Sequence, residues 1–442
     1  MADADIDLLR ARIATTSPVV PVARVCELRQ NLLRVAPAVR SWSIGDRVEV
    51  GRRFGRLEGE IVVIDREGAG ILTDESPDGV RLGDWVEQSR QPGLRPNKNW
   101  MGRILDPFGR PLDGRPLVSG MESVPLKRSP PLPASRKRLG QRLETGMRVF
   151  NTLLPLVKGQ RIGLFAGSGV GKSTLLGSFA RHVEADVIVI ALIGERGREL
   201  RDFAEDVLGS DGLARSVIVA ATSDQSPLIR RRCAWAAMAV AEYFRDRGQH
   251  VLLLADSVTR LADAHREIAL SAGELPGHGG YPASMSHLIM SLAERSGPGS
   301  EGSGDITAVF SVLVAGSDME GPVADVLRGV LDGHVVMDRE IAERGRYPAI
   351  NLLRSVSRSL PAAASDYENR LIAQTRLLLG AYDRAEMMIQ AGLYVGGSDP
   401  VVDAATRVWP ALDGFLSQPE PATSRESFAQ LETILGGTLS LA

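Results

Sequence analysis

A glycine-rich stretch beginning at Ala166 constrains the fold of this 442-residue chain more than any other feature. It reads Ala166-Gly-Ser-Gly-Val-Gly-Lys-Ser-Thr174, after a short apolar run and before a helical pattern. This context is typical of a P-loop, in which backbone N–H groups curl around phosphate at a helix N-terminus. The strict pattern has glycine where this chain has Ala166, a difference of one methyl group. A chance glycine-rich turn is the less favoured alternative.

The P-loop predicts a role for each of its residues. The glycines let successive amides face the phosphates, Lys172 reaches the β- and γ-phosphates, and the hydroxyl of Ser173 is placed on Mg²⁺. The predicted nucleotide-binding residues here are Gly167, Ser168, Gly169, Val170, Gly171, Lys172, Ser173 and Thr174.

The composition describes a soluble globular protein. Hydrophobic residues make up 44% and charged residues 24%, and 52 basic against 54 acidic residues leave no global attraction to nucleic acid. Cys26 and Cys233 fit no metal spacing, which favours a reducing cytosol. The acidic N-terminus has no secretion signal, and no apolar run approaches the ~18 residues of a membrane span. We therefore expect a cytoplasmic protein with no specific nucleic-acid partner.

The sequence pattern divides the chain into four parts. Residues 1–18 have apolar positions at helical spacing, which fits a frayed tail or a helix that docks to a partner. Residues 19–88 contain short β-like pieces and predict a small β-barrel domain. Residues 89–360 contain the P-loop, and residues 361–442 predict a helical C-terminal domain.

Residues 90–138 are rich in proline and are predicted to be mostly irregular connecting chain. Near their end lie two basic clusters, Lys127-Arg128 and Arg136-Lys137-Arg138. No aromatic residues are interleaved with them, so a solvated linker face is favoured over a nucleic-acid patch.

Continuous apolar runs alternate with helical patterns from about residue 139. Runs of this kind fit strands buried on both faces, which predicts a mostly parallel sheet with helices on each side and thus an α/β fold. The predicted strands are Ile162–Phe165, Val187–Ile193, Val217–Ala221, Val251–Ala255 and Ile306–Val314. The predicted intervening helices are Thr174–Glu184, Pro227–Arg247 and Asp256–Leu270.

Hydrolysis needs a metal anchor, a group that positions water, and a charge that stabilises the phosphoryl group. Asp256 ends an apolar run, as a Walker B acid does, and is predicted to hold Mg²⁺. Glu195 follows another predicted strand by two residues, so sheet topology would bring it to the same crevice. We interpret Glu195 as the carboxylate that orients the attacking water, and Arg196 as a contact to the γ-phosphate or a support for Glu195. An exposed loop of ion pairs is an equally weighted alternative.

Further motifs follow the P-loop in a fixed order. They are Leu192-Ile-Gly-Glu-Arg-Gly-Arg-Glu199, Asp246–Arg260, His265–Leu270, Leu331-Asp-Gly-His334, Arg346-Tyr-Pro-Ala-Ile350, Ser355-Val-Ser-Arg358, Gly397–Pro400 and Trp409–Leu412. Over roughly residues 90–420, these motifs resemble the type III export ATPase branch of the rotary ATPases, and within it the flagellum-specific export ATPases. That branch commonly carries alanine at the position of Ala166. Leu261 and His265 depart from its usual Tyr and Gln.

The resemblance implies a RecA-like ATPase core between a β-barrel and a helical domain, assembled as a homohexamer with ATP sites between subunits. ATP and Mg²⁺ are the implied cofactors, with Lys172 and Ser173 at the phosphates and Mg²⁺, Asp256 as the Walker B acid and Glu195 as the catalytic carboxylate.

Two further residues receive roles from the resemblance alone. Tyr347 matches the aromatic residue that lies against adenine, and Arg358 matches the arginine finger inserted into the neighbouring subunit's site. Such a finger makes hydrolysis depend on assembly. Core packing of Tyr347 and a surface ion pair of Arg358 are the alternatives.

The resemblance also implies partners and a location. These are stator or regulator and central-stalk proteins, membrane proteins of the export gate, and export chaperones and substrates, at the cytoplasmic face of the inner membrane. The implied function is ATP hydrolysis that energises type III protein export for flagellum assembly. The alternatives are an injectisome export ATPase, an ATP synthase catalytic subunit, a RecA-like helicase and a nucleotide-responsive protein without turnover.

Overall fold

The computed structural model describes residues 21–29, 32–36, 42–89, 93–314, 319–417 and 423–436. These form two compact units. The smaller unit contains the described residues before Gly93 together with residues 225–229 and 264–275, and the larger unit contains the remainder. The predicted tail, residues 1–18, lies outside the described residues.

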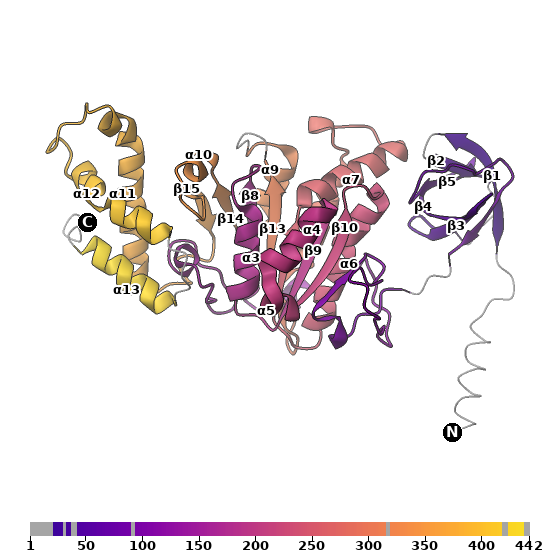
Figure 1. The fold of residues 1–442 in the computed structure, drawn as a ribbon, viewed down its shortest axis with the longest axis horizontal. Coiled ribbons are helices and arrows are strands. Elements are labelled where there is room, and N and C mark those ends of the chain that lie inside the picture. Colours follow the sequence, from indigo (N-terminus) through magenta and orange to yellow (C-terminus); the bar gives the residue numbers. More distant parts are fainter. Residues whose placement is uncertain are drawn as a thin grey trace, which may run out of the picture. The chain divides into compact units, whose positions relative to one another are not determined.

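The smaller unit is built on a closed six-stranded barrel, which confirms the predicted β-barrel (Figure 1). Its strands follow the order β1-β2-β5-β4-β3-β6 and are β1 (Val22–Arg29), β2 (Leu32–Val35), β3 (Arg47–Arg52), β4 (Gly55–Asp65), β5 (Gly68–Thr73) and β6 (Trp85–Gln88). Alternate side chains of β1 and β3 point into an apolar core. The sequence did not predict β2 and β6, because four residues are too few for a clear alternating pattern.

The larger unit is built on a nine-stranded sheet, which confirms the predicted α/β fold. Eight strands follow the order β15-β14-β8-β13-β11-β9-β10-β7, and β12 pairs with β13. Only β12 and β15 are antiparallel to their neighbours. The strands are β7 (Arg103–Leu105), β8 (Arg161–Ala166), β9 (Val187–Glu195), β10 (Ser216–Thr222), β11 (Val251–Asp256), β12 (Gly297–Pro298), β13 (Asp305–Leu313), β14 (Gly333–Met337) and β15 (Ile350–Ser357).

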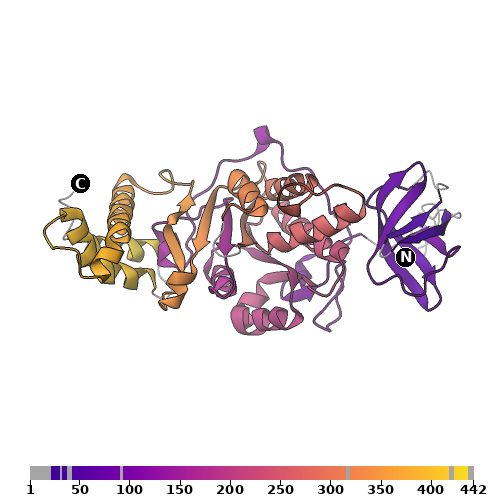
Figure 2. The same ribbon diagram turned by 90° about the horizontal axis from the view of Figure 1, so that it is seen from above.

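Helices lie on both faces of this sheet (Figure 2). Their bounds are α2 (Arg148–Asn151), α3 (Lys172–His182), α4 (Gly197–Asp202), a π-helix (Phe203–Leu208), α5 (Gly209–Ala214), α6 (Pro227–Arg245), α7 (Val258–Ser271), α8 (Ser284–Glu294), α9 (Pro322–Val330) and α10 (Arg339–Glu343). The central strands are buried along nearly their whole length, as their continuous apolar runs require.

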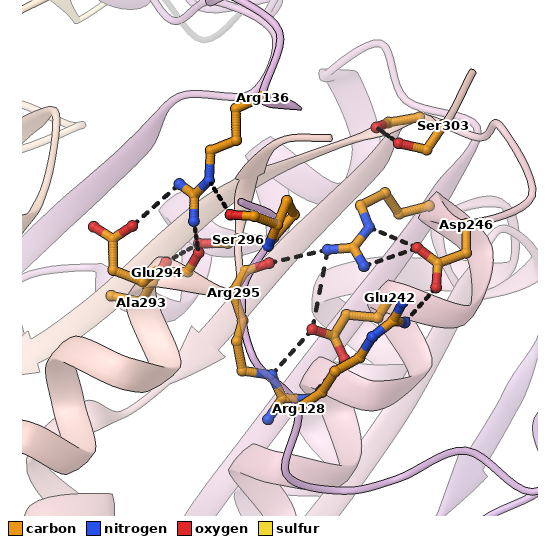
Figure 3. A network of polar contacts seen from close by, with 12 residues as sticks. Arg128, Arg136, Glu242, Asp246, Ala293, Glu294, Arg295, Ser296 and Ser303 are labelled. Atoms are coloured by element: carbon orange, nitrogen blue, oxygen red, sulfur yellow. Dashed lines mark hydrogen bonds and ion pairs between the residues drawn. The ribbon is translucent and has the colours of Figure 1, made fainter. Parts of the chain in front are cut away.

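The segment from residue 93 to 138 is mostly irregular, as predicted, and contains one short strand and two 3₁₀ turns. Its strand β7 pairs in parallel with β10 at one side of the sheet. Three residues are too few to predict this pairing from the sequence. Of its basic clusters, Arg128 is exposed as expected and forms an ion pair with Asp246 (Figure 3). The expectation of a solvated face is wrong for Arg136, which is mostly covered and pairs with Glu294 (Figure 3). It is also wrong for Lys137, which pairs with the mostly buried Asp305.

Three helices complete the chain beside the β15 edge of the sheet (Figure 1). They are α11 (Asp366–Gln390), α12 (Pro400–Leu416) and α13 (Ser424–Leu435), and the sequence did not predict α13. Capping boxes at Ser365 and Thr423 begin α11 and α13. These helices belong to the same compact unit as the sheet, so the division predicted at residue 360 stays a prediction.

No helix among the described residues has both the length and the apolar character needed to cross a bilayer.

Candidate active site

The main predicted site residues lie together where the parallel strands end, which we call the carboxyl edge of the sheet. There β8 leads into the P-loop, β11 ends at Asp256 and β9 ends at Glu195. Strand β9 runs through Glu195 instead of stopping two residues earlier, because Ser223 N–H donates to the carbonyl of Glu195 at 3.0 Å. Chain reversal at this edge leaves a crevice, which is where ligands of parallel sheets bind.

The P-loop has the predicted strand, glycine turn and helix. Gly169 and Gly171 have φ values of 78° and 87°, in the left-handed region that side chains disfavour. Gly171 is the N-cap of α3, so the free N–H groups of that helix point at the predicted phosphate position. Ala166 is fully buried at the end of β8, and its methyl group therefore belongs to the core.

A charged centre lies beneath the loop. The ammonium of Lys172 forms an ion pair with Asp256, and its Nζ lies 3.8 Å from Oε1 of Glu195. Ser311 on β13 donates its hydroxyl to Oδ1 of Asp256 at 2.7 Å. Asp256 is only 3% exposed, so these contacts fix its carboxylate in place. Sequence reasoning missed Ser311, since a serine inside an apolar strand carries no motif.

A small cleft of about 130 Å³ opens beside this centre. It is lined by Ser173, Leu192, Glu195, Glu199, Asp202, Phe203, Val207 and Asp256. The predicted metal residues Ser173 and Asp256 thus share one cleft with the predicted catalytic carboxylate. Sequence reasoning gave no role to Glu199 and Asp202, although their spacing of three residues places them on one face of α4.

The environment of Glu195 raises its pKa to about 7. Burial is the largest cause, the negative charge of Asp256 is the next, and the ammonium of Lys172 opposes both. Glu199 adds to the rise through a side-chain hydrogen bond and its charge. A carboxylate with a pKa near neutrality is suited to accept a proton from water.

Arg196 does not point into this centre. Its guanidinium donates to Oε1 of Glu199 at 3.1 Å, and its side chain is 80% exposed. The ion-paired loop considered as an alternative therefore describes Arg196 in this structure, while Glu195 is drawn into the site. A role for Arg196 stays a prediction.

Tyr347 lies beside the P-loop. A Cβ atom built on Gly171 would be 3.3 Å from Cδ1 of the tyrosine ring, and Tyr347 remains 49% exposed. Half-exposure argues against simple core packing and leaves a ring face for a flat ligand.

Arg358 lies away from the residues above. It follows the last residue of β15, Ser357, which pairs with Gly333 at the start of β14, and the next residue of β14, His334, pairs with Gly163 of β8. Arg358 therefore lies where the parallel strands β8 and β14 begin, which we call the amino edge of the sheet. The six residues of β8 separate this edge from the P-loop by roughly 20 Å. Arg358 cannot reach the Lys172 of its own chain.

Comparisons with known proteins agree with this geometry. A family model described as the ATP synthase alpha/beta family, nucleotide-binding domain, matches residues 146–357, and one described as the T3SS EscN ATPase C-terminal domain matches residues 364–433. A Caulobacter vibrioides protein named flagellum-specific ATP synthase is 44% identical over 439 residues, covering 97% of this chain and 98% of that protein. The chain belongs to the family of flagellar and type III secretion ATPases.

Other members of the family support the same assignment. A type 3 secretion system ATPase of Xanthomonas euvesicatoria is 42% identical over 419 residues, 93% of either chain. The assembled ATPase EscN of the enteropathogenic E. coli type III secretion system is 34% identical, with a TM-score of 0.85 over 93% of this chain and 100% of that chain. EscN in complex with its central stalk EscO gives 0.83 at the same identity and coverage. As a member of this ATPase family, the chain binds nucleotide and hydrolyses ATP.

Proposed function

We propose that this ATPase works as a homohexameric ring that energises type III protein export for flagellum assembly. One observation carries the proposal: Lys172, Glu195 and Asp256 lie at one edge of the sheet and Arg358 at the other. A site that uses both sets of residues must be formed by two copies of the chain. Such a head-to-tail contact generates a ring when the rotation closes.

The residues at the carboxyl edge fit Mg²⁺ and ATP. Gly169 and Gly171 keep the loop free of Cβ atoms where phosphate would approach, and Ser173 and Asp256 offer the oxygen ligands that Mg²⁺ prefers. No cluster of three or more His, Cys, Asp and Glu side chains in the described part of the chain is arranged to hold a metal ion. The ion would therefore be shared with the phosphates, whose charge it would neutralise.

The protein's own groups divide the remaining work. Lys172 exchanges its contact with Asp256 for the phosphates, the P-loop amides bind them, and Tyr347 contacts the adenine ring. Glu195, in its ionised form, accepts a hydrogen bond from the attacking water and orients it. Arg358 of the adjacent subunit places its guanidinium on the γ-phosphate as negative charge shifts during transfer. Arg196 holds Glu199, which adjoins Glu195.

The partners and location belong to the same proposal. EscN has been described with its central stalk EscO, and we expect a stalk protein to bind this ring in the same way. The ring would also meet a stator or regulator, export chaperones and substrates, and membrane proteins of the export gate. We place it in the cytoplasm at the inner membrane.

An injectisome ATPase is the second candidate, because secretion ATPases are among the relatives at similar identity. The deciding experiment deletes the gene and restores either the wild-type chain or the Glu195→Gln chain. We expect deletion to remove motility and flagellar filaments, and only the wild-type chain to restore them. Intact filaments after deletion would refute the flagellar assignment, and loss of effector secretion instead would favour the injectisome.

A further inference from the structure

We propose that Arg161 and Asp332 are positioning residues for Arg358, so that strand β8 carries the P-loop at one end and holds the finger for the neighbouring subunit at the other. This inference rests on the proposed function, in which Arg358 acts in another subunit's site.

The contact between Arg161 and Asp332 is extensive. Oδ2 of Asp332 accepts from the backbone N–H of Arg161 at 3.0 Å and from its Nε at 3.0 Å, and Oδ1 accepts from Nη2 at 3.2 Å. The backbone N–H of Asp332 donates back to the carbonyl of Arg161 at 2.8 Å. The side chain of Arg161 is only 12% exposed. Paired, charge-assisted hydrogen bonds of this kind stabilise the contact and also fix the relative position of the two residues.

Asp332, held by Arg161, in turn fixes the backbone of Arg358. Its carbonyl accepts from the N–H of Arg358 at 3.0 Å and from Nε2 of Gln160 at 3.1 Å. The same Gln160 amide donates to the hydroxyl of Ser357 at 3.1 Å, and that hydroxyl donates to the carbonyl of Pro155 at 2.7 Å. Both Gln160 and Ser357 are buried. The residue before Arg358 and its own N–H are therefore fixed to the start of β8.

The side chain of Arg358 is exposed, in contrast to this buried support. Its one described hydrogen bond runs from Nη2 to the carbonyl of Arg328 at 3.2 Å, at the end of α9. A guanidinium that must meet a phosphate on another subunit gains from a fixed backbone, because a misplacement of about 1 Å can cost ~10²-fold in rate. The arrangement suits an arginine presented outward.

Arg161 has a second partner that provides a control. Its Nη1 donates to Oε1 of Glu294 at 2.8 Å, and Glu294 has no contact with the backbone of Arg358 among the described hydrogen bonds. Glu294→Gln weakens one arm of Arg161 and leaves the arm to Asp332 intact. Its kcat should stay within about two-fold of wild type.

The main variants are Asp332→Asn, which keeps the shape of the side chain, and Arg161→Gln. For both we expect kcat to fall about 10- to 100-fold while KM for ATP stays within about three-fold, since a finger acts on the transition state. Assembly is checked by size-exclusion chromatography. A rise in KM with unchanged kcat would overturn the proposal.

Mixed rings then tell which site is damaged. The Asp332→Asn chain has an intact P-loop, so mixing it with a Lys172→Ala chain, whose finger is intact, should restore activity at roughly a quarter of the interfaces. Mixing it with an Arg358→Ala chain should restore nothing, because neither chain supplies a sound finger. Recovery of activity in the mixture with Arg358→Ala would overturn the proposal. So would the absence of recovery in both mixtures.

A reference mixture separates this inference from the proposed function. Arg358→Ala mixed with Lys172→Ala tests the finger alone. If that mixture regains no activity, Arg358 is not a finger for the neighbouring subunit. If it regains activity but the mixture of Asp332→Asn with Lys172→Ala does not, only the positioning role of Arg161 and Asp332 is refuted.

Discussion

Lys172 and Arg358 lie at opposite edges of one sheet, separated by the length of β8. No single chain can bring both to the same phosphate, so a chain that folds correctly but stays monomeric would hold an incomplete site. Turnover per chain should therefore rise with protein concentration as subunits associate.

The first prediction concerns complementation between two inactive chains. Arg358→Ala should lower kcat by ~10³-fold or more, and Lys172→Ala should abolish phosphate binding. Mixed in equal amounts, they should regain activity, because some interfaces combine an intact P-loop with an intact finger. Steady-state ATPase assays on the mixture measure this.

The control for this experiment is a chain that carries both substitutions. Mixed with Lys172→Ala, it supplies no intact P-loop, and the mixture should stay inactive. Equal activity in the two mixtures would show that Arg358 does not act across an interface.

The second prediction concerns Glu195. Glu195→Gln keeps the size of the side chain and removes the charge that orients water, so kcat should fall by ~10²-fold or more while ATP still binds. Equilibrium binding of a fluorescent ATP analogue and phosphate release are the two measurements. Undiminished phosphate release would remove Glu195 from its assigned role.

The third prediction follows from the raised pKa of Glu195. Below about pH 7 this side chain is protonated and has lost the negative charge that orients and polarises water, so kcat/KM should rise with pH through a midpoint near 7. Glu199→Gln removes a carboxylate that raises this pKa, so the midpoint should move to lower pH. The comparison cancels the titration of ATP itself. An unmoved midpoint would mean that another group sets the profile.

The fold was predictable wherever the sequence repeats a pattern over enough residues. The five central strands of the sheet follow from continuous apolar runs, and the turn at Gly171 follows from the need for positive φ. Strands β2, β6 and β7 are too short to show a period, and their places are set by neighbours distant in sequence.

The site was predictable where a motif describes it. The pairing of Lys172 with Asp256 follows from the P-loop and the end of β11, but the exposed position of Arg196 does not. The position of Arg358, far from the P-loop, follows only from the register in which β15 pairs with β14 and β14 with β8, and the sequence does not reveal that register. Likewise, Arg161 and Asp332 are 171 residues apart and carry no mark of their contact.

The fourth prediction concerns Gly171. Alanine there must adopt a φ of 87° and place its Cβ 3.3 Å from the Tyr347 ring, so ATP affinity should fall about tenfold. Gly248→Ala is the matched control, since Gly248 has a φ of 84° with open space around it. Both variants should lose similar stability, but only Gly171→Ala should lose affinity. Equal ATP affinities in the two variants would contradict this.

The fifth prediction concerns the ion network of Figure 3. Arg295 donates from Nε and Nη2 to the two oxygens of Glu242 at 3.0 and 2.7 Å, and both side chains are almost fully buried. Arg295→Ala removes both hydrogen bonds to the buried carboxylate of Glu242 and leaves it, among the described residues, only the Nη1 of Arg245, 4.0 Å from its Oε1. The free energy of unfolding should therefore fall by about 3 kcal/mol. Denaturant titration measures it.

The double variant Arg295→Met with Glu242→Leu removes both charges and should recover most of that loss, because an apolar pair avoids the cost of burying ions. The exposed pair Arg339–Glu343 is the control, and Arg339→Ala should cost less than about 1 kcal/mol. Arg295 also donates from Nη1 to the carbonyl of Leu126 at 2.7 Å, so its loss should free the segment around Leu126. Faster proteolysis there, in Arg295→Ala but not in Arg339→Ala, would show that the buried pair holds the proline-rich segment to the ATPase core; equal cleavage in both would show that it does not.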